Sequence, residues 1–205
     1  MSSLRAGDRR IIRTRMMIYE AFLRLLHRKA YEEISVIDIA EKADINRSTF
    51  YSHFVDKADL LQKMIADKLD RLTESIRSCA APSAIAPSFH APDPIFLTLF
   101  EHVSEHDYFY RVMLSKSPAG DFRSKFIETI REGFFERLSK LDLDQKLQVP
   151  LDLLLDYISL STGGIMEKWL SDDKIYSPHH MALQLTRMGA LGIYKSMGLP
   201  ESQRS

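Results

Sequence analysis

The chain has 205 residues, 45% of them hydrophobic, which fits a globular protein with a buried core and excludes a disordered or fibrous chain. Lys and Arg together number 28, as do Asp and Glu, so no overall charge draws the protein to nucleic acid or to an anionic membrane. Any nucleic-acid surface must therefore be local.

The N-terminal residues carry no apolar run, and no stretch of 18 uncharged apolar residues occurs, so neither export nor a membrane span is expected. The single cysteine, Cys79, cannot form an internal disulfide, which favours a reducing compartment and a role as a small buried side chain. Redox sensing is the alternative role for Cys79. We expect a cytoplasmic protein with no membrane contact.

Residues 9–29 are predicted to form an amphipathic helix with a basic start. Its apolar residues recur at helical spacing: Ile12, Met16, Tyr19, Phe22, Leu23 and Leu26. Residues 1–30 hold an excess of six positive charges, because eight basic residues (5, 9, 10, 13, 15, 24, 28 and 29) stand against two acidic ones (8 and 20).

Two short helices follow. Ser35 is a predicted N-cap, with Asp38 three residues later, for a helix that ends around Ala43. Residues 44–46 form a polar break, after which residues 47–54 have room for two turns, with Asn46 as the N-cap.

A long fourth helix starts at the predicted cap Asp56 and keeps an apolar stripe well past Asp70. Residues 79–94 contain four of the eight prolines and are predicted to be a surface loop or hinge.

Five further helices are expected at about residues 95–104, 106–114, 118–141, 150–170 and 178–197. Three of them open with proline, and Ser117 and Ser177 are candidate N-caps. Because no segment shows the period-two alternation of a strand, the predicted fold is all-α with about nine helices.

The segment 35–54 has the dimensions of a helix-turn-helix, whose second helix lies in the major groove of DNA. Phe50 and Phe54 would face inward. The side chains left to meet base edges and phosphates are Arg47, Ser48, Thr49, Ser52 and His53.

The sequence resembles the TetR/AcrR family of bacterial regulators over roughly residues 9–60. The resemblance lies in the pair Ile39-Ala40, the turn, and the series Tyr51-Ser-His53-Phe54-Val-Asp-Lys57-Ala-Asp-Leu60. One departure is Asp44, where the family commonly has glycine; the position calls for a left-handed backbone, which aspartate tolerates.

The resemblance implies a DNA-binding domain over residues 9–56 and a C-terminal regulatory and dimerisation domain over residues 57–205, entered through the fourth helix. It also implies that Tyr51 and Lys57 contact phosphates, while Arg47, Ser48 and Thr49 read bases. In such proteins the C-terminal helices dimerise and enclose a pocket for a small-molecule effector.

Aromatic and polar residues from position 102 onward are candidates for lining that pocket, although each also suits a plain core. The ligand-binding set is His102, Tyr108, Tyr110, Met113, Tyr157, Ser161 and Trp169, with Phe109, Phe134 and Met166 as further wall residues. His102 and His106, with Glu101 and Glu105 nearby, raise the alternative of a metal site, but solvated histidines are favoured, so no metal or other cofactor is expected.

The last two long helices carry apolar stripes suited to a dimer contact, unless these stripes face only their own subunit. The stripes are Leu151, Leu154, Leu155 and Ile158 on one helix, and Met181, Leu185, Met188 and Gly192 on the other, with Gly189 and Ala190 allowing close approach.

Three classes of function remain to be compared. The leading hypothesis is a homodimeric repressor that a small molecule releases from a near-palindromic operator in double-stranded DNA. The alternative is a DNA-binding co-activator or adaptor whose C-terminal domain binds a protein and no small ligand. No enzyme is expected, since the sequence holds no nucleophile elbow, phosphate loop or acid–base cluster at useful spacing.

Overall fold

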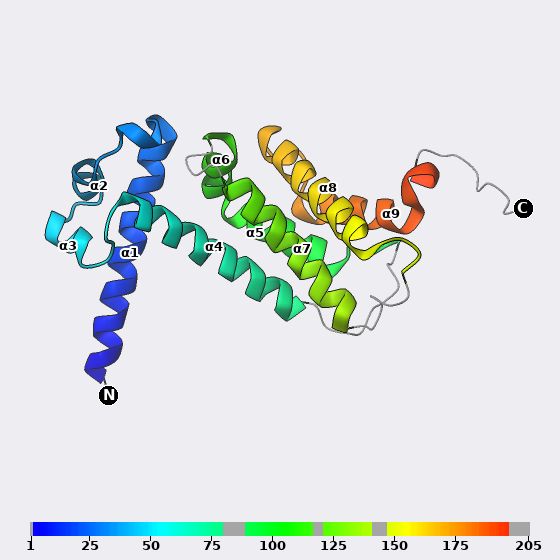
Figure 1. The fold of residues 1–205 in the computed structure, drawn as a ribbon, viewed down its shortest axis with the longest axis horizontal. Helices are drawn as coiled ribbons and strands as arrows, with labels where there is room; N and C mark the ends of the chain where they lie inside the picture. The colour runs from blue at the N-terminus through cyan, green and yellow to red at the C-terminus, as the bar shows by residue number, and fades with distance from the viewer. Residues whose placement is uncertain (1, 80–88, 117–120, 141–146, 197–205) are drawn as a thin grey trace, which may run out of the picture. The chain divides into compact units, whose positions relative to one another are not determined.

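A computed structural model describes residues 2–79, 89–116, 121–140 and 147–196 of the chain (Figure 1). These residues form helices and no strands, which confirms the all-α prediction. The elements are α1 (Ser2–Arg28), the 3-10 turn η1 (Tyr31–Glu33), α2 (Val36–Lys42), α3 (Arg47–Tyr51), α4 (Lys57–Cys79), α5 (Pro94–Glu105), α6 (Asp107–Lys116), α7 (Phe122–Lys140), α8 (Leu151–Ser171) and α9 (Pro178–Ser196).

The chain divides into two compact units, and the division falls inside α4. The first unit comprises Met1–Lys68 with Val112–Arg123, and the second comprises Leu69–Arg111 with Ser124–Ser205. The division lies twelve residues beyond residue 56, where the sequence places a domain boundary. In the described ranges, no helix is long and apolar enough to cross a bilayer.

The first unit is built around α1, which packs on α2, while α2 packs on α3 (Figure 1). Its buried core includes Ile18, Phe22, Leu26, Ile39, Phe50 and Leu60. Each such side chain stabilises the fold by about 1.5–3 kcal/mol through removal from water. The predicted inward positions of Phe50 and Phe54 are confirmed, since their exposed fractions are 0% and 2%.

Capping contacts fix where the short helices start. The Ser35 hydroxyl accepts the Asp38 backbone N–H and the Asp38 carboxylate accepts the Ser35 N–H, which confirms the predicted cap. Asp56 also caps α4, through the N–H of Asp59 at 2.8 Å. Asn46 occupies the N-cap position of α3 in extended geometry, as predicted, although its side chain makes no capping hydrogen bond.

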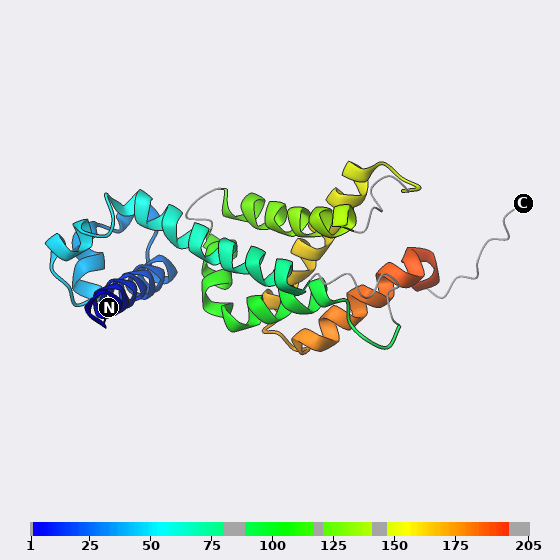
Figure 2. The ribbon, with the colours of Figure 1, turned by 90° about the horizontal axis from the view of Figure 1, so that it is seen from below.

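The second unit contains most of the remaining helices, and α5 packs against α9 within it (Figure 2). Its core includes Leu99, Phe100, Val103, Phe126, Ile130 and Met166. At the start of α5, the Asp93 carboxylate caps the N–H of Ile95 and accepts Arg137 of α7, while the Asp93 N–H donates to Thr186 of α9. This junction joins three helices at one residue.

The helix ends in this unit differ in detail from the sequence expectation. Pro178 is the first residue of α9 and Ser177 accepts the His180 N–H, as predicted, whereas Pro150 lies one residue before α8. Ser117 and Pro118 fall outside the described residues. Gly192 has φ 71° and ψ 171°, so it interrupts α9 near its end.

Candidate nucleic-acid interface

The turn between α2 and α3 is closed by backbone hydrogen bonds and one left-handed residue. The Ala43 N–H donates to the carbonyl oxygen of Ile39 at 2.9 Å, and the Ile45 N–H donates to the carbonyl oxygen of Ala40 at 3.0 Å. Asp44 between them has φ 53°, which confirms the left-handed backbone expected there. The turn holds the two short helices in a fixed relative orientation.

Helix α3 presents one polar face to solvent because its opposite face is apolar. Arg47, Ser48, Tyr51 and Ser52 are exposed, while Thr49 is half-buried. The Tyr51 side chain is 50% exposed and its ring lies edge-on to the buried Phe50 ring, with 5.5 Å between centroids. The predicted base-reading and phosphate-binding residues of α3 thus lie on one accessible surface.

Two residues at the end of α3 have local constraints. The Ser52 hydroxyl donates to the Thr49 carbonyl at 2.7 Å, which holds that side chain against its own helix. Burial, together with the charge of Arg15, lowers the pKa of His53 below its ordinary value. A neutral imidazole at physiological pH offers one donor and one acceptor and carries no charge.

Lys57, the first residue of α4, is bound to the chain itself. Its ammonium donates to the carbonyl oxygens of Tyr31 at 2.5 Å and Ile34 at 2.7 Å. The same nitrogen lies 4.2 Å from the centre of the Tyr31 ring. Lys57 therefore joins the start of α4 to the connection between α1 and α2, a contact that the sequence did not indicate.

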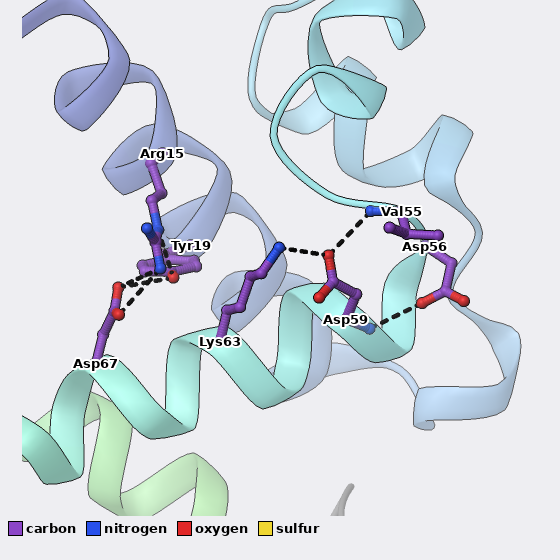
Figure 3. A network of polar contacts seen from close by, with 7 residues as sticks. All are labelled: Arg15, Tyr19, Val55, Asp56, Asp59, Lys63 and Asp67. Atoms are coloured by element: carbon purple, nitrogen blue, oxygen red, sulfur yellow. Dashed lines mark hydrogen bonds and ion pairs between the residues drawn. The ribbon is translucent and has the colours of Figure 1, made fainter. Parts of the chain in front are cut away.

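A second set of contacts fastens α1 to α4 within the first unit (Figure 3). The Asp67 carboxylate accepts Arg15 at 2.9 Å and the Tyr19 hydroxyl at 2.8 Å, and Arg15 also donates to the Tyr19 oxygen at 2.8 Å. Burial raises the pKa of Tyr19, so the phenol remains a donor. The i, i+4 spacing of Arg15 and Tyr19 hints at this pair, but nothing in the sequence identifies Asp67 as its partner.

The predicted ligand-binding residues separate into buried and exposed groups. His102, Tyr110, Met113 and Trp169 are buried, whereas Tyr108 and Tyr157 are 43% and 54% exposed. Two of the buried residues meet in the second unit: the His102 and Tyr110 rings lie edge to face, with 5.8 Å between centroids. The further wall residues Phe109, Phe134 and Met166 are buried as well.

The two histidines of the metal site considered as an alternative, His102 and His106, lie next to each other. The His102 and His106 rings lie 4.6 Å apart, centre to centre. Among the described residues, no group of three or more His, Cys, Asp or Glu side chains is arranged to hold a metal ion.

Ser161 and Trp169 lie together at an open concavity of about 410 Å³ on α8 and the start of α9. Its walls are mostly apolar, and the Lys168–Asp172 ion pair, 2.7 Å long, lies among them. The lining includes Leu160, Gly164, Ile165, Ile175, Tyr176 and Met181.

The stripes predicted for dimerisation only partly face solvent. Leu155 of α8 and Leu185 of α9 are buried in their own subunit, with exposed fractions of 1% and 7%. The more exposed apolar face of α8 consists instead of Leu153, Tyr157 and Leu160, exposed by 62%, 54% and 53%. On the part of α9 that carries the predicted stripe, Met188, Gly189, Ala190 and Gly192 are exposed.

Two family models match the chain. The model described as bacterial regulatory proteins of the tetR family matches residues 18–64, which include the helix-turn-helix. The model described as transcriptional regulator C-terminal region matches residues 91–189. Together they cover the main part of both units.

Two individual relatives are named as HTH-type transcription regulators. The HTH-type transcriptional regulator YxbF of Bacillus subtilis (strain 168) is 26% identical over 92% of this chain and 47% of its own length. DhaS, the HTH-type dhaKLM operon transcriptional activator of Lactococcus lactis, is 39% identical over 30% of this chain and 33% of its own length. The chain thus spans half or less of the length of these two curated relatives.

A solved structure shares the fold. The transcriptional regulator FadR from Bacillus subtilis, in complex with stearoyl-CoA, superposes with a TM-score of 0.65 at 14% identity, covering 87% of this chain and 98% of that chain. Identity at this level supports the fold alone.

Proposed function

Because the chain belongs to the TetR family of bacterial regulatory proteins, we propose that it is a sequence-specific DNA-binding transcriptional regulator. The observation that carries the proposal is the polarity of residues 47–54, which are α3 and the residues that follow it: Phe50 and Phe54 are buried, and Arg47, Ser48, Tyr51 and Ser52 face solvent. A protein that acts on chromosomal DNA in a bacterium works in the cytoplasm.

The candidate DNA-binding residues divide by chemistry. Arg47 can donate two parallel hydrogen bonds to a guanine edge, and Ser48 and Thr49 are short enough for close approach to bases. Tyr51 and Lys57 are proposed to contact phosphates. The Lys57 ammonium has three N–H groups, of which two donate to the carbonyls of Tyr31 and Ile34, so the third would donate to the phosphate. Ser52 and the neutral His53 would then add hydrogen bonds without charge.

We propose a homodimer through α8 and α9, because a near-palindromic operator requires two copies of α3. The exposed face of Leu153, Tyr157 and Leu160 supports this arrangement better than the stripe through Leu155 does. A Cβ added at Gly189 would meet no atom within 4 Å, so this position leaves room for close approach of a partner helix.

The proposed mode of action is repression relieved by a small molecule. The effector would bind the second unit, stabilise one conformer and change the distance between the two copies of α3. Apolar residues dominate the described concavity, and FadR from Bacillus subtilis is in complex with stearoyl-CoA, so long-chain acyl compounds are the first effectors to test.

Binding to labelled DNA from upstream of the gene and its neighbours tests the proposal. We expect tight, salt-sensitive and sequence-selective binding that an Arg47→Ala, Tyr51→Ala double variant loses, while both proteins remain dimeric in sedimentation. A folded, dimeric wild type that binds all sequences equally would contradict a sequence-specific regulator. Addition of acyl-CoA compounds of different chain length then tests release.

A second candidate function is activation through a protein partner. It is favoured by the likeness to DhaS, which is named an operon activator. In this alternative the second unit binds a protein and no small ligand. Release of DNA by an acyl compound in the purified system supports the repressor; unchanged DNA binding with every compound, together with transcription that rises with the protein, supports the activator.

A further inference from the structure

The N-terminal half of α1 carries positive charge on a surface that the rest of the first unit does not cover. Residues 9–17 contain four arginines and no carboxylate. Arg9, Arg10 and Arg13 are exposed, and so are Ile11 and Ile12, by 55% and 58%. Figure 1 shows these turns of α1 extending away from α2 and α3.

The arginines of this segment do not all point the same way. Arg15 faces α4 and is neutralised by Asp67 at 2.8 Å. Arg13 precedes it by two residues, which at about 100° per residue directs its side chain to the opposite side of the helix. Within the part of the chain that the structure describes, neither Arg10 nor Arg13 forms an ion pair.

Charged and apolar side chains share the outward face instead of separating onto two faces. Arg10, Arg13 and the exposed Met17 lie three or four residues apart and therefore form one surface on the side of the helix opposite Arg15. A helix that lies in a membrane surface keeps its apolar side chains on one side and its basic ones on the other. A mixed surface fits a phosphate backbone, where arginines meet phosphates and apolar groups meet sugars and thymine methyl groups.

The segment also continues from the helix-turn-helix within the same unit. The rings of Tyr19 and Phe54 lie 5.8 Å apart, so α1 at Tyr19 is beside the end of the helix-turn-helix. At a rise of about 1.5 Å per residue, Arg13 and Arg10 lie about 9 and 13 Å further along α1. B-DNA offers a phosphate about every 1.7 Å of helix axis, so a site that continues past the half-site presents many phosphates over such a length.

We infer that Arg10 and Arg13 of α1 form a second DNA-binding surface, which contacts phosphates of duplex DNA flanking the half-site that α3 reads. The inference rests on the proposed DNA-binding function and extends it. Its ligand is the backbone of any flanking sequence, so it adds affinity and salt dependence without base preference.

The test measures how DNA affinity depends on salt concentration for two duplexes. One is the minimal operator selected with the wild type, and the other is the same operator extended at each end by about one helical turn, or about 10 base pairs. The variant is Arg10→Gln, Arg13→Gln. The control is Arg24→Gln, Arg28→Gln, which removes the same charge from the far end of α1. On the long duplex, the plot of log affinity against log salt should lose about two units of slope per protomer in the variant and little in the control.

The outcomes separate the two proposals. If the wild type selects no operator, the proposed function fails. If it selects one, but the Gln variant matches the wild type in slope on the long duplex, the inference on α1 is overturned. Loss of binding to phosphatidylcholine–phosphatidylglycerol vesicles without a change on DNA would assign the surface to membranes instead. An Arg10→Lys, Arg13→Lys variant should keep the slope, which excludes misfolding as the cause.

Discussion

The Lys57 ammonium lies 2.7 Å from the carbonyl oxygen of Ile34, so the first residue of α4 is hydrogen-bonded to the residue that precedes the capped start of α2. A second bond to Tyr31 and the position over its ring complete the contact. The 3-10 turn η1 runs from Tyr31 to Glu33, so Lys57 donates to the carbonyl of its first residue and to that of Ile34, the residue that follows the turn.

Replacing Lys57 by Met should destabilise the first unit, because hydrogen bonds from a charged donor to the carbonyls contribute about 1.5–3 kcal/mol. The matched control is Lys63→Met, which removes the same charge from α4 and breaks a pair with Asp59 worth about 0.3–0.5 kcal/mol, together with a contact 5.6 Å from the centre of the Phe54 ring. Urea unfolding at constant pH measures both. Equal midpoints for the two variants would show that the carbonyl contacts contribute nothing.

The same two variants test whether Lys57 contacts phosphate. If it does, the salt dependence of DNA binding should fall by about 0.9 unit of slope per protomer in Lys57→Met and stay unchanged in Lys63→Met. A parallel loss in both variants would instead reflect the general charge of α4, and no loss in either would remove Lys57 from the phosphate-binding set.

Asp44 should be replaceable by glycine without loss of stability. Its φ of 53° is costly for a residue with a Cβ, and glycine adopts this backbone freely. We expect Asp44→Gly to be at least as stable as the wild type and Asp44→Ala to be about 1 kcal/mol less stable than the glycine variant. Thermal unfolding compares the three proteins, and an alanine variant as stable as the glycine variant would contradict the strain argument.

Local signals in the sequence predicted the helix-turn-helix closely. Ser35 with Asp38 marks the start of α2, and the left-handed backbone at Asp44 is expected from the resemblance, because the family commonly has glycine there. These features depend on residues within a few positions of one another, where propensity and hydrogen bonding act directly. The exposed face of α3 follows in the same way from the inward positions of Phe50 and Phe54.

Contacts between distant residues could not be predicted in this way. Helical periodicity groups Leu151, Leu154, Leu155 and Ile158 on one stripe, but it does not say whether a partner or the same subunit covers that stripe. Leu155 is buried in its own subunit, whereas Tyr157, expected at a ligand, is 54% exposed. Lys57 shows the same limit, because its partners lie 23 and 26 residues away and are backbone atoms.

Acid should weaken α2 through its capping box. The Ser35 hydroxyl and backbone N–H donate to Asp38 and hold the pKa of its carboxyl far below the ordinary value. A carboxyl with a lowered pKa stabilises the fold above its unfolded pKa of about 3.9, and this contribution disappears as the pH falls below that value. Asp38→Asn should therefore be less stable than the wild type at pH 6, with the gap in urea midpoint closing below about pH 4. A gap that stays constant down to pH 3 would exclude the linkage; Glu41→Gln, on an exposed position of the same helix, should follow the wild type.

The ion pair between Arg137 and Asp93 should contribute far more than the one between Arg77 and Glu136. The first pair is 2.5 Å long with side chains only 18% and 15% exposed, whereas the second is 2.7 Å long with 52% and 31% exposed. Removing one partner of a largely buried pair leaves an uncompensated charge and costs about 3 kcal/mol or more, while an exposed pair contributes at most about 1 kcal/mol. The decrease in the free energy of unfolding should therefore be several times larger for Arg137→Met than for Arg77→Met.

A double variant identifies the cause of that loss. Asp93→Asn keeps an acceptor for the Ile95 N–H, because asparagine is also a good N-cap, but it removes the negative charge. If the uncompensated carboxylate causes the loss, the double variant Arg137→Met, Asp93→Asn should recover part of the stability that Arg137→Met loses, and a double-mutant cycle in urea measures the recovery. Additive losses would show that Arg137 acts through packing against α5 instead, since a packing loss does not depend on the charge of Asp93.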